Sequence, residues 1–248
     1  MSIAMIGLLF AAGFFSGVVN AIAGGGTFLT FGALTLVGLP PIAANATSSI
    51  VQFPGYITST IAYWPEIRAR LRSTFLLAAI SAIGALAGAL LLLSLDNPSF
   101  ARMVPWLLLA ATLVFAAGPW LKPKALNEHP PHPLASALSQ FFMAVYGGFF
   151  GAGMGIMMLA ILGVTLGGNY HRLNALKNLL SIVIATVAIA VFVSGGVVVW
   201  SKAAVMIPAV ALGGYSGVWA ARRVPQSLMR AIVVAVGLGL TVYYFLKV

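Results

Sequence analysis

The sequence predicts an all-α polytopic membrane protein of two inverted repeats, each with about five membrane segments, one of them short. Two observations carry most of this prediction. Apolar residues make up 61% of the 248 residues and charged residues only 6%, whereas a soluble domain carries about 25% charged residues. Residues of the second half of the chain also echo the first half at a fixed offset of 129 positions.

The repeated positions are mainly glycines and asparagines. They pair Gly24 with Gly153, Gly26 with Gly155, Gly38 with Gly167, Asn45 with Asn174, Ala46 with Ala175, Gly84 with Gly213 and Gly88 with Gly217. Because the chain has 27 glycines, chance would give only about 1.4 glycine pairs at one offset. Five such pairs are present. Internal duplication in so apolar a chain is typical of transporters, in which two repeats enclose the substrate site.

Apolar runs that approach or exceed the length of a membrane span, about 20 helical residues, recur along the whole chain. They cover residues 2–23, 42–64, 73–95, 103–121, 134–153, 173–193, 203–221 and 231–246. Two shorter runs, 27–39 and 156–166, occupy equivalent places in the two repeats. The proline-containing stretch 127–133 is the expected linker between a first repeat, 1–126, and a second repeat, 134–248.

Basic residues predict how the chain crosses the membrane. If both short runs cross, ten basic residues lie on one side and three on the other, which the positive-inside rule favours. This gives ten crossings with both termini outside the cytoplasm. Because five crossings is an odd number, the second repeat is inverted. The net charge of +10 is then explained by basic cytoplasmic loops, and we expect no nucleic-acid partner. The chain also indicates no particular oligomeric state.

Two glycine-rich runs precede the short segments and form the first candidate substrate site. Glycine allows backbone N–H groups to approach a ligand, and the start of a helix favours an anion. The alternative is that these glycines only allow helices to pack closely, as we expect for Gly84, Gly88, Gly213 and Gly217. The candidate residues are Gly24, Gly25, Gly26, Thr27, Gly153 and Gly155.

Polar residues that follow the short segments form the second candidate group. Polar side chains inside a membrane are costly unless partnered, so their recurrence at equivalent positions suggests binding. The candidates are Asn45, Thr47, Ser48, Asn174, Lys177 and Asn178. As alternatives, Asn45 and Asn174 cap helices or bond between helices, and Lys177 extends its side chain to the membrane surface. Interhelical hydrogen bonds suffice to explain Asn20, Gln52 and Gln140.

Missing residue types exclude other functions. The only acidic residues, Glu66, Asp96 and Glu128, fall in predicted loops, and the chain has no cysteine. A carboxylate-based ion site, a metal centre and an intramembrane enzyme are therefore disfavoured, and we expect no cofactor. Because the one charge within a predicted span is Lys177, the expected substrate is a small anion.

The glycine run with its short segment, the following segment 40–49, and the recurrence of both within 147–178 resemble the sulfite exporter TauE/SafE family. The stretch 200–223 resembles it too, with glycines four apart before Arg222 and Arg223. The resemblance covers nearly the whole chain. It implies a permease of the bacterial inner membrane for small sulfur-containing or organic anions. The second glycine run departs from the fuller family pattern, which weakens the expectation that both repeats contribute equally.

From these observations we expect a secondary transporter, an exporter of a small anion such as sulfite or a short organosulfonate. Alternating access would follow from rocking of one repeat against the other. Two alternatives stay open from the sequence: an anion channel, and a membrane assembly subunit with no substrate of its own.

Overall fold

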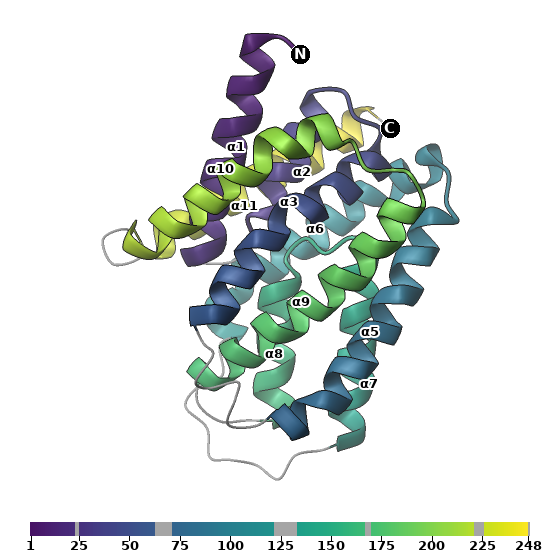
Figure 1. Ribbon diagram of the computed structural model, residues 1–248, viewed down its shortest axis with the longest axis vertical. Coiled ribbons are helices and arrows are strands. Elements are labelled where there is room, and N and C mark those ends of the chain that lie inside the picture. The colour runs from purple at the N-terminus through teal and green to yellow at the C-terminus, as the bar shows by residue number, and fades with distance from the viewer. Residues whose placement is uncertain (23–24, 63–70, 122–132, 167–169, 221–225, 248) are drawn as a thin grey trace.

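Helices make up almost all of the described chain in the computed structural model, which describes residues 1–22, 25–62, 71–121, 133–166, 170–220 and 226–247 (Figure 1). The helices of these ranges are α1 (Ile3–Ile22), α2 (Thr27–Leu36), α3 (Pro41–Ala62), α5 (Leu71–Leu93), α6 (Asn97–Leu121), α7 (Pro133–Phe149), α8 (Met154–Leu166), α9 (Tyr170–Ser194), α10 (Trp200–Ala220) and α11 (Gln226–Lys247). The described ranges contain no strand. The predicted all-α polytopic fold is confirmed.

Helix length separates the spanning helices from the short ones. Four helices of the described ranges contain stretches long and apolar enough to cross a membrane: Ile3–Asn20, Thr74–Leu93, Asn97–Ala117 and Arg172–Ser194. By contrast, α2 has 10 residues and α8 has 13. At about 1.5 Å per residue they reach only about half to two thirds of a hydrocarbon core of about 30 Å. The two short segments are confirmed, whereas their full crossing stays a prediction.

Glycine C-caps end two of the helices sharply. After α2, Gly38 has φ +85° and its N–H bonds the Thr35 carbonyl, while the N–H of Leu39 bonds the Leu34 carbonyl. Gly196, with φ +65°, ends α9 in the same manner. Both turns are Schellman motifs, in which glycine avoids the strain of a side chain at positive φ. The cap after α2 turns the chain directly into α3.

The turn between α5 and α6 carries an acidic cap. The Asp96 carboxylate accepts a hydrogen bond from the Ser99 N–H at 3.0 Å, which fixes the first turn of α6. Hydrogen bonds from the Ser99 side chain and backbone hold the pKa of this exposed carboxyl below its ordinary value. The acidic residue therefore serves the helix start.

The helices of the two halves correspond at the offset found in the sequence. Moved by 129 residues, α1, α2, α3, α5 and α6 coincide within three residues with α7, α8, α9, α10 and α11. The helix contacts follow the same correspondence, since α1 packs on α10 as α7 packs on α5, and α3 packs on α10 as α9 packs on α5. The division into repeats at 127–133 and the inversion of the second repeat stay predictions. In Figure 1, the N- and C-termini lie at the same end of the molecule.

The contacts sort most helices into two packing groups that mix the halves of the chain. The first packing group is α1, α2, α3 and α10, and the second is α7, α8, α9 and α5. Among the described helices, α3 and α9 make the main direct contact between the groups, and α6 packs against α11. Each packing group therefore takes three helices from one half and one helix from the other.

Glycines bring the backbones together within each packing group. A Cβ added at Gly213 of α10 would overlap the Phe14 carbonyl of α1, and one added at Gly88 of α5 would overlap the Val145 carbonyl of α7. Gly84 also lies against α7, with Phe141 O only 2.7 Å from an added Cβ. The prediction that these glycines serve packing is confirmed. The neighbours of Gly217 lie partly outside the described residues, so its predicted role in packing stays a prediction.

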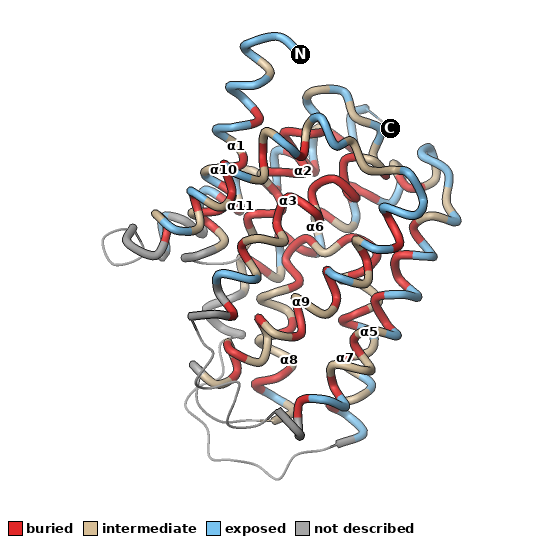
Figure 2. The backbone as a smooth tube through the Cα atoms, in the orientation of Figure 1, coloured by how far each residue is buried: buried red, intermediate tan, exposed pale blue. Residues whose placement is uncertain are grey.

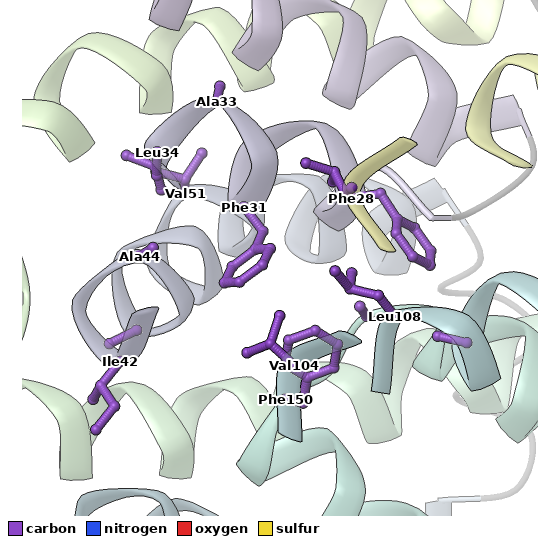
Figure 3. Close-up of a cluster of buried hydrophobic side chains, with 14 of the residues drawn as sticks. Phe28, Phe31, Ala33, Leu34, Ile42, Ala44, Val51, Val104, Leu108 and Phe150 are labelled. Carbon is purple, nitrogen blue, oxygen red and sulfur yellow. The ribbon is translucent and has the colours of Figure 1, made fainter. Parts of the chain in front are cut away.

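Aromatic residues fill the core around the short helix α2, where eight of its ten residues are buried. Figure 3 shows Phe31 of α2 facing Phe150, close to Val104 of α6. The rings of Phe31 and Phe150 meet edge to face with centroids 5.5 Å apart, a favourable geometry. Figure 2 shows buried residues gathered where the helices meet, whereas the first turns of α1 are exposed. The core therefore surrounds α2 with buried side chains.

Two neighbouring glycines of α10 test the close contact. Gly213→Ala places a methyl group into the backbone of α1 and should destabilise the protein by about 1–3 kcal/mol. Gly214→Ala is the matched control, because nothing lies within 4 Å of its added Cβ. Thermal unfolding in detergent should show a lowered melting temperature for the first variant only. Equal melting temperatures for the two variants would contradict the close packing of α1 on α10.

Candidate functional site

Two matching polar stripes run along α3 and α9, the helices through which the packing groups meet. The stripe on α3 is Asn45, Ser48 and Gln52, and the stripe on α9 is Asn174, Lys177 and Ser181. Both have the same spacing, three and then four residues, so each stripe lies on one face of its helix. The two stripes differ in how their polar atoms are partnered.

Two residues of the α3 stripe, Ser48 and Gln52, are hydrogen-bonded to neighbouring helices. The Ser48 and Thr30 hydroxyls lie 2.7 Å apart. The Gln52 amide Nε2 donates to Thr30 Oγ1 at 3.2 Å and to the Ser16 hydroxyl. Ser16 in turn donates to the Gly26 carbonyl at 2.7 Å. This network joins α1, α2 and α3, and it confirms that Gln52 makes interhelical hydrogen bonds, as Gln140 does to Ser81 on α5.

The first polar residues of α3 connect distant segments. Asn45 Nδ2 donates to the Phe149 carbonyl at the end of α7, at 2.9 Å, and Thr47 Oγ1 accepts a bond from the Val199 N–H at 3.0 Å. Because α3 begins at Pro41, Asn45 lies one turn inside the helix. Of the alternatives for Asn45, the helix cap is therefore wrong and the interhelical bond is confirmed.

The first glycine-rich run is closely packed against protein. A Cβ at Gly26 would overlap the Ser16 carbonyl, and one at Gly25 would lie 2.5 Å from the Phe115 ring. Thr27, which begins α2, is 8% exposed. Gly24 lies outside the described residues. Close packing alone accounts for Gly25 and Gly26, so their role in binding stays a prediction without support from this geometry.

The second glycine-rich run leaves more room and lies beside the lysine. A Cβ at Gly153 would lie 3.4 Å from Ala111 Cβ, and one at Gly155 would lie 3.7 Å from Lys177 Cδ, which is ordinary contact. The loop is anchored by the Tyr146 hydroxyl, which donates to the Ala152 carbonyl at 2.6 Å. The structure therefore brings Gly155, at the start of α8, next to Lys177 on α9.

Four polar side chains of α9 lack partners among the described residues: Asn174, Lys177, Asn178 and Ser181. Asn178 is 4% exposed and Ser181 is fully buried, while Asn174 and Lys177 are half-buried. None of the four makes a hydrogen bond with another described residue, and the buried Ser181 Oγ has no partner at all there. Since polar groups within a membrane normally find partners, this face of α9 is suited to a ligand.

The charge on this face is positive and unpaired within the described part of the chain. Lys177 lies about two helical turns after the start of α9, and no ion pair to it occurs among the described residues. An ammonium group with neutral amide and hydroxyl neighbours suits an anion rather than a cation. The described residues also contain no group of three metal-ligating side chains. The arrangement supports anion binding.

Sequence reasoning did not select Ser181 or the network of Ser16 and Thr30. The duplication offset could have found Ser181, because it occupies the position of Gln52 in the other half. The network could not be found in this way. It depends on the approach of α1 and α2 to α3, and no local pattern encodes that contact.

Comparison with known proteins identifies the family. The model of the family described as "Sulfite exporter TauE/SafE" matches residues 9–244. The chain belongs to this family. A Haemophilus influenzae protein named "Probable membrane transporter protein" is 28% identical over 241 residues, with 97% of this chain and 94% of that protein covered.

Two other relatives of this TauE/SafE protein have similar names. "Probable membrane transporter protein YfcA" of Escherichia coli K12 is 28% identical over 94% of this chain and 86% of its own length. "Probable membrane transporter protein ORF9" of a Sinorhizobium species is 28% identical over 96% of this chain and 91% of its own length. The family and these names support an integral membrane protein that acts in transport.

The network on α3 of this TauE/SafE protein can be tested for a structural role. Thr30→Val removes the hydroxyl that joins Ser48 and Gln52, and it should lower stability by about 1–3 kcal/mol because buried polar atoms lose their partner. Thr186→Val is the control, since Thr186 is exposed and bonds only the Ile182 carbonyl of its own helix. Melting temperatures in detergent measure the difference. An unchanged value for Thr30→Val would count against the network as a stabilising feature.

Proposed function

We propose that this protein is a secondary transporter that exports a small anion, such as sulfite or a short organosulfonate, by alternating access. The observation that carries the proposal is the unpartnered polar face of α9 with Lys177 beside the start of α8. We place the protein in the bacterial inner membrane with its termini outside the cytoplasm, as the asymmetry of basic residues favours. The family description supports the substrate class.

Binding would depend mainly on Lys177. Its ammonium group would attract the anion, and the N–H groups at the start of α8, near Gly153 and Gly155, would add donors and the positive end of the helix dipole. Asn174 and Asn178 would hydrogen-bond the oxygen atoms of the substrate. On this proposal Asn45, Thr47, Ser48 and the first glycine run hold the scaffold around the site.

The helix contacts also suggest which parts would move. The closest backbone contacts, α1 on α10 and α5 on α7, each join a helix of the first half to one of the second. Rocking of one sequence repeat against the other would break both contacts. We therefore propose that the two packing groups move as units about the contact between α3 and α9, the two helices that carry the polar stripes.

Lys177→Met tests the binding role of the charge. Loss of a charged hydrogen bond, worth about 1.5–3 kcal/mol, should weaken anion binding about ten- to hundredfold. The folded yield should be kept, because an unpaired charge is removed from a spanning helix. The measurement is counterflow of labelled sulfite into liposomes, with the concentration for half-saturation compared between variants.

Lys202→Met is the matched control for the charge. Lys202 lies at the start of α10, in the packing group that does not contain α9, and its Nζ contacts Met5 Sδ at 2.9 Å. Its substitution should leave half-saturation unchanged. Equal effects of the two substitutions would reject Lys177 as a binding residue. Flux that neither saturates nor shows counterflow would indicate a channel, and no anion flux at all would favour the assembly subunit.

A cross-link tests the moving units. Met5→Cys with Lys202→Cys, bridged by a short bifunctional thiol reagent, ties α1 to α10 in a chain that has no other cysteine. If the packing groups move as units, counterflow should continue after cross-linking, because both cysteines belong to one group. Abolished counterflow would instead support rocking between the sequence repeats. Each single-cysteine variant treated with the reagent serves as the control.

A further inference from the structure

Ser181 differs from most other hydroxyl residues within the described helices, and it shares a buried, unpartnered hydroxyl with Thr60 and Thr112. Such hydroxyls commonly bond the carbonyl four residues earlier in their own helix. Ser81 bonds Leu77 O at 2.7 Å and Thr186 bonds Ile182 O at 2.8 Å in this manner. Ser181 is fully buried, yet its Oγ makes no hydrogen bond with any described residue. Leaving a buried hydroxyl unpaired costs about 1–3 kcal/mol, so this position has a cost to explain.

Comparison with the corresponding position in the first half shows which hydrogen-bond partners Ser181 lacks. At the offset of 129, Ser181 stands where Gln52 stands, and the Gln52 amide bonds Ser16 and Thr30. The residues that correspond to those two partners are Val145 and Leu159, which carry no polar side chain. The second half therefore keeps a polar group on α9 but lacks the protein partners that satisfy its counterpart.

The position of Ser181 relative to Lys177 indicates what the partner is. The two residues lie one turn apart on the same face of α9, so their Cβ atoms are about 5–6 Å apart. A neutral hydroxyl donor and an ammonium group at this spacing match two oxygen atoms of one small oxyanion. Both groups are unpartnered within the described chain.

We propose that Ser181 contacts the substrate directly, its hydroxyl donating a hydrogen bond to one oxygen of the oxyanion whose charge Lys177 balances. This inference rests on the proposed transport function and adds a residue to its binding site. The ligand class is a small anion with at least two acceptor oxygens, such as sulfite or a sulfonate.

Ser181→Ala tests the hydrogen bond. In liposome counterflow, the concentrations of sulfite and of methanesulfonate that give half-saturation should rise about tenfold or more. This is the effect expected for a lost hydrogen bond to a charged group. The melting temperature without ligand should stay equal or rise, because an unsatisfied buried hydroxyl is removed. Ser181→Thr, which keeps the hydroxyl, should restore most of the affinity.

Ser81→Ala is the matched control with opposite expectations. Ser81 is equally buried on α5, but its hydroxyl bonds Leu77 O and accepts from Gln140 Nε2 at 2.8 Å. Its removal should lower the melting temperature and leave half-saturation unchanged. A Ser181→Ala variant that behaves like Ser81→Ala, less stable with unchanged affinity, would overturn the inference and give Ser181 a structural role.

Cysteine labelling gives a second, independent readout. The native chain has no cysteine, so Ser181→Cys introduces a single thiol. A thiol reagent that carries a sulfonate group should modify it in liposomes, and methanesulfonate should slow the reaction. Ser81→Cys should not react. A Ser181→Cys thiol that reacts at the same rate with and without methanesulfonate would also overturn the inference.

The wild-type protein separates the two proposals. If wild type shows saturable counterflow while the Ser181 variants keep its affinity and lack protection, only the role of Ser181 fails. If wild type shows no saturable anion counterflow, the proposed function fails, and the role of Ser181 fails with it.

Discussion

Close backbone contact between glycine-bearing helices is the constraint on which the rest of this structure depends. Inside a bilayer, helices gain little from burying apolar surface and associate through close packing. The contacts of α1 with α10 and of α5 with α7 supply it, since Gly213 and Gly88 leave room for a facing carbonyl group. Because each contact joins the two halves of the chain, neither half folds around itself. The packing groups, rather than the sequence repeats, are the physical units of the protein.

This interlocking determines where a binding site can form. The packing groups meet mainly through α3 and α9, and both helices carry a polar stripe. In the absence of water, each polar group must find a partner in the protein or in a ligand. On α3 the partners are protein atoms, with Ser48 bonded to Thr30. On α9 the described residues provide none for Lys177 or Ser181. This asymmetry of partners is the reason why we propose α9 as the helix that binds the ligand.

Much of the fold could be predicted from the sequence because its signals are local. Apolar runs bounded by glycines indicate the helices. The offset of 129 between repeated residues predicts the correspondence of α2 with α8. The role of each glycine could not be predicted, because Gly26 and Gly155 look equivalent in sequence. Gly26 is packed against Ser16, while Gly155 meets the stem of Lys177. In the same way, the partner of Asn45 lies at Phe149, more than a hundred residues away. Such contacts depend on the tertiary arrangement.

On the proposed function, the difference between the two stripes fits what a single small anion requires. Had both halves kept a lysine at the Ser48 and Lys177 positions, two positive charges would stand on helices in direct contact, at a high cost in a medium of low dielectric constant. One charge balances one monoanion, and hydroxyl and amide groups can serve its remaining oxygens. On the proposed function the first half takes no direct part in ligand binding, and its polar residues join α1, α2 and α3. On the proposed function, a neutral stripe bonded to α1 and α2 and a charged, unpartnered stripe on α9 together suit the movement of one anion across the membrane.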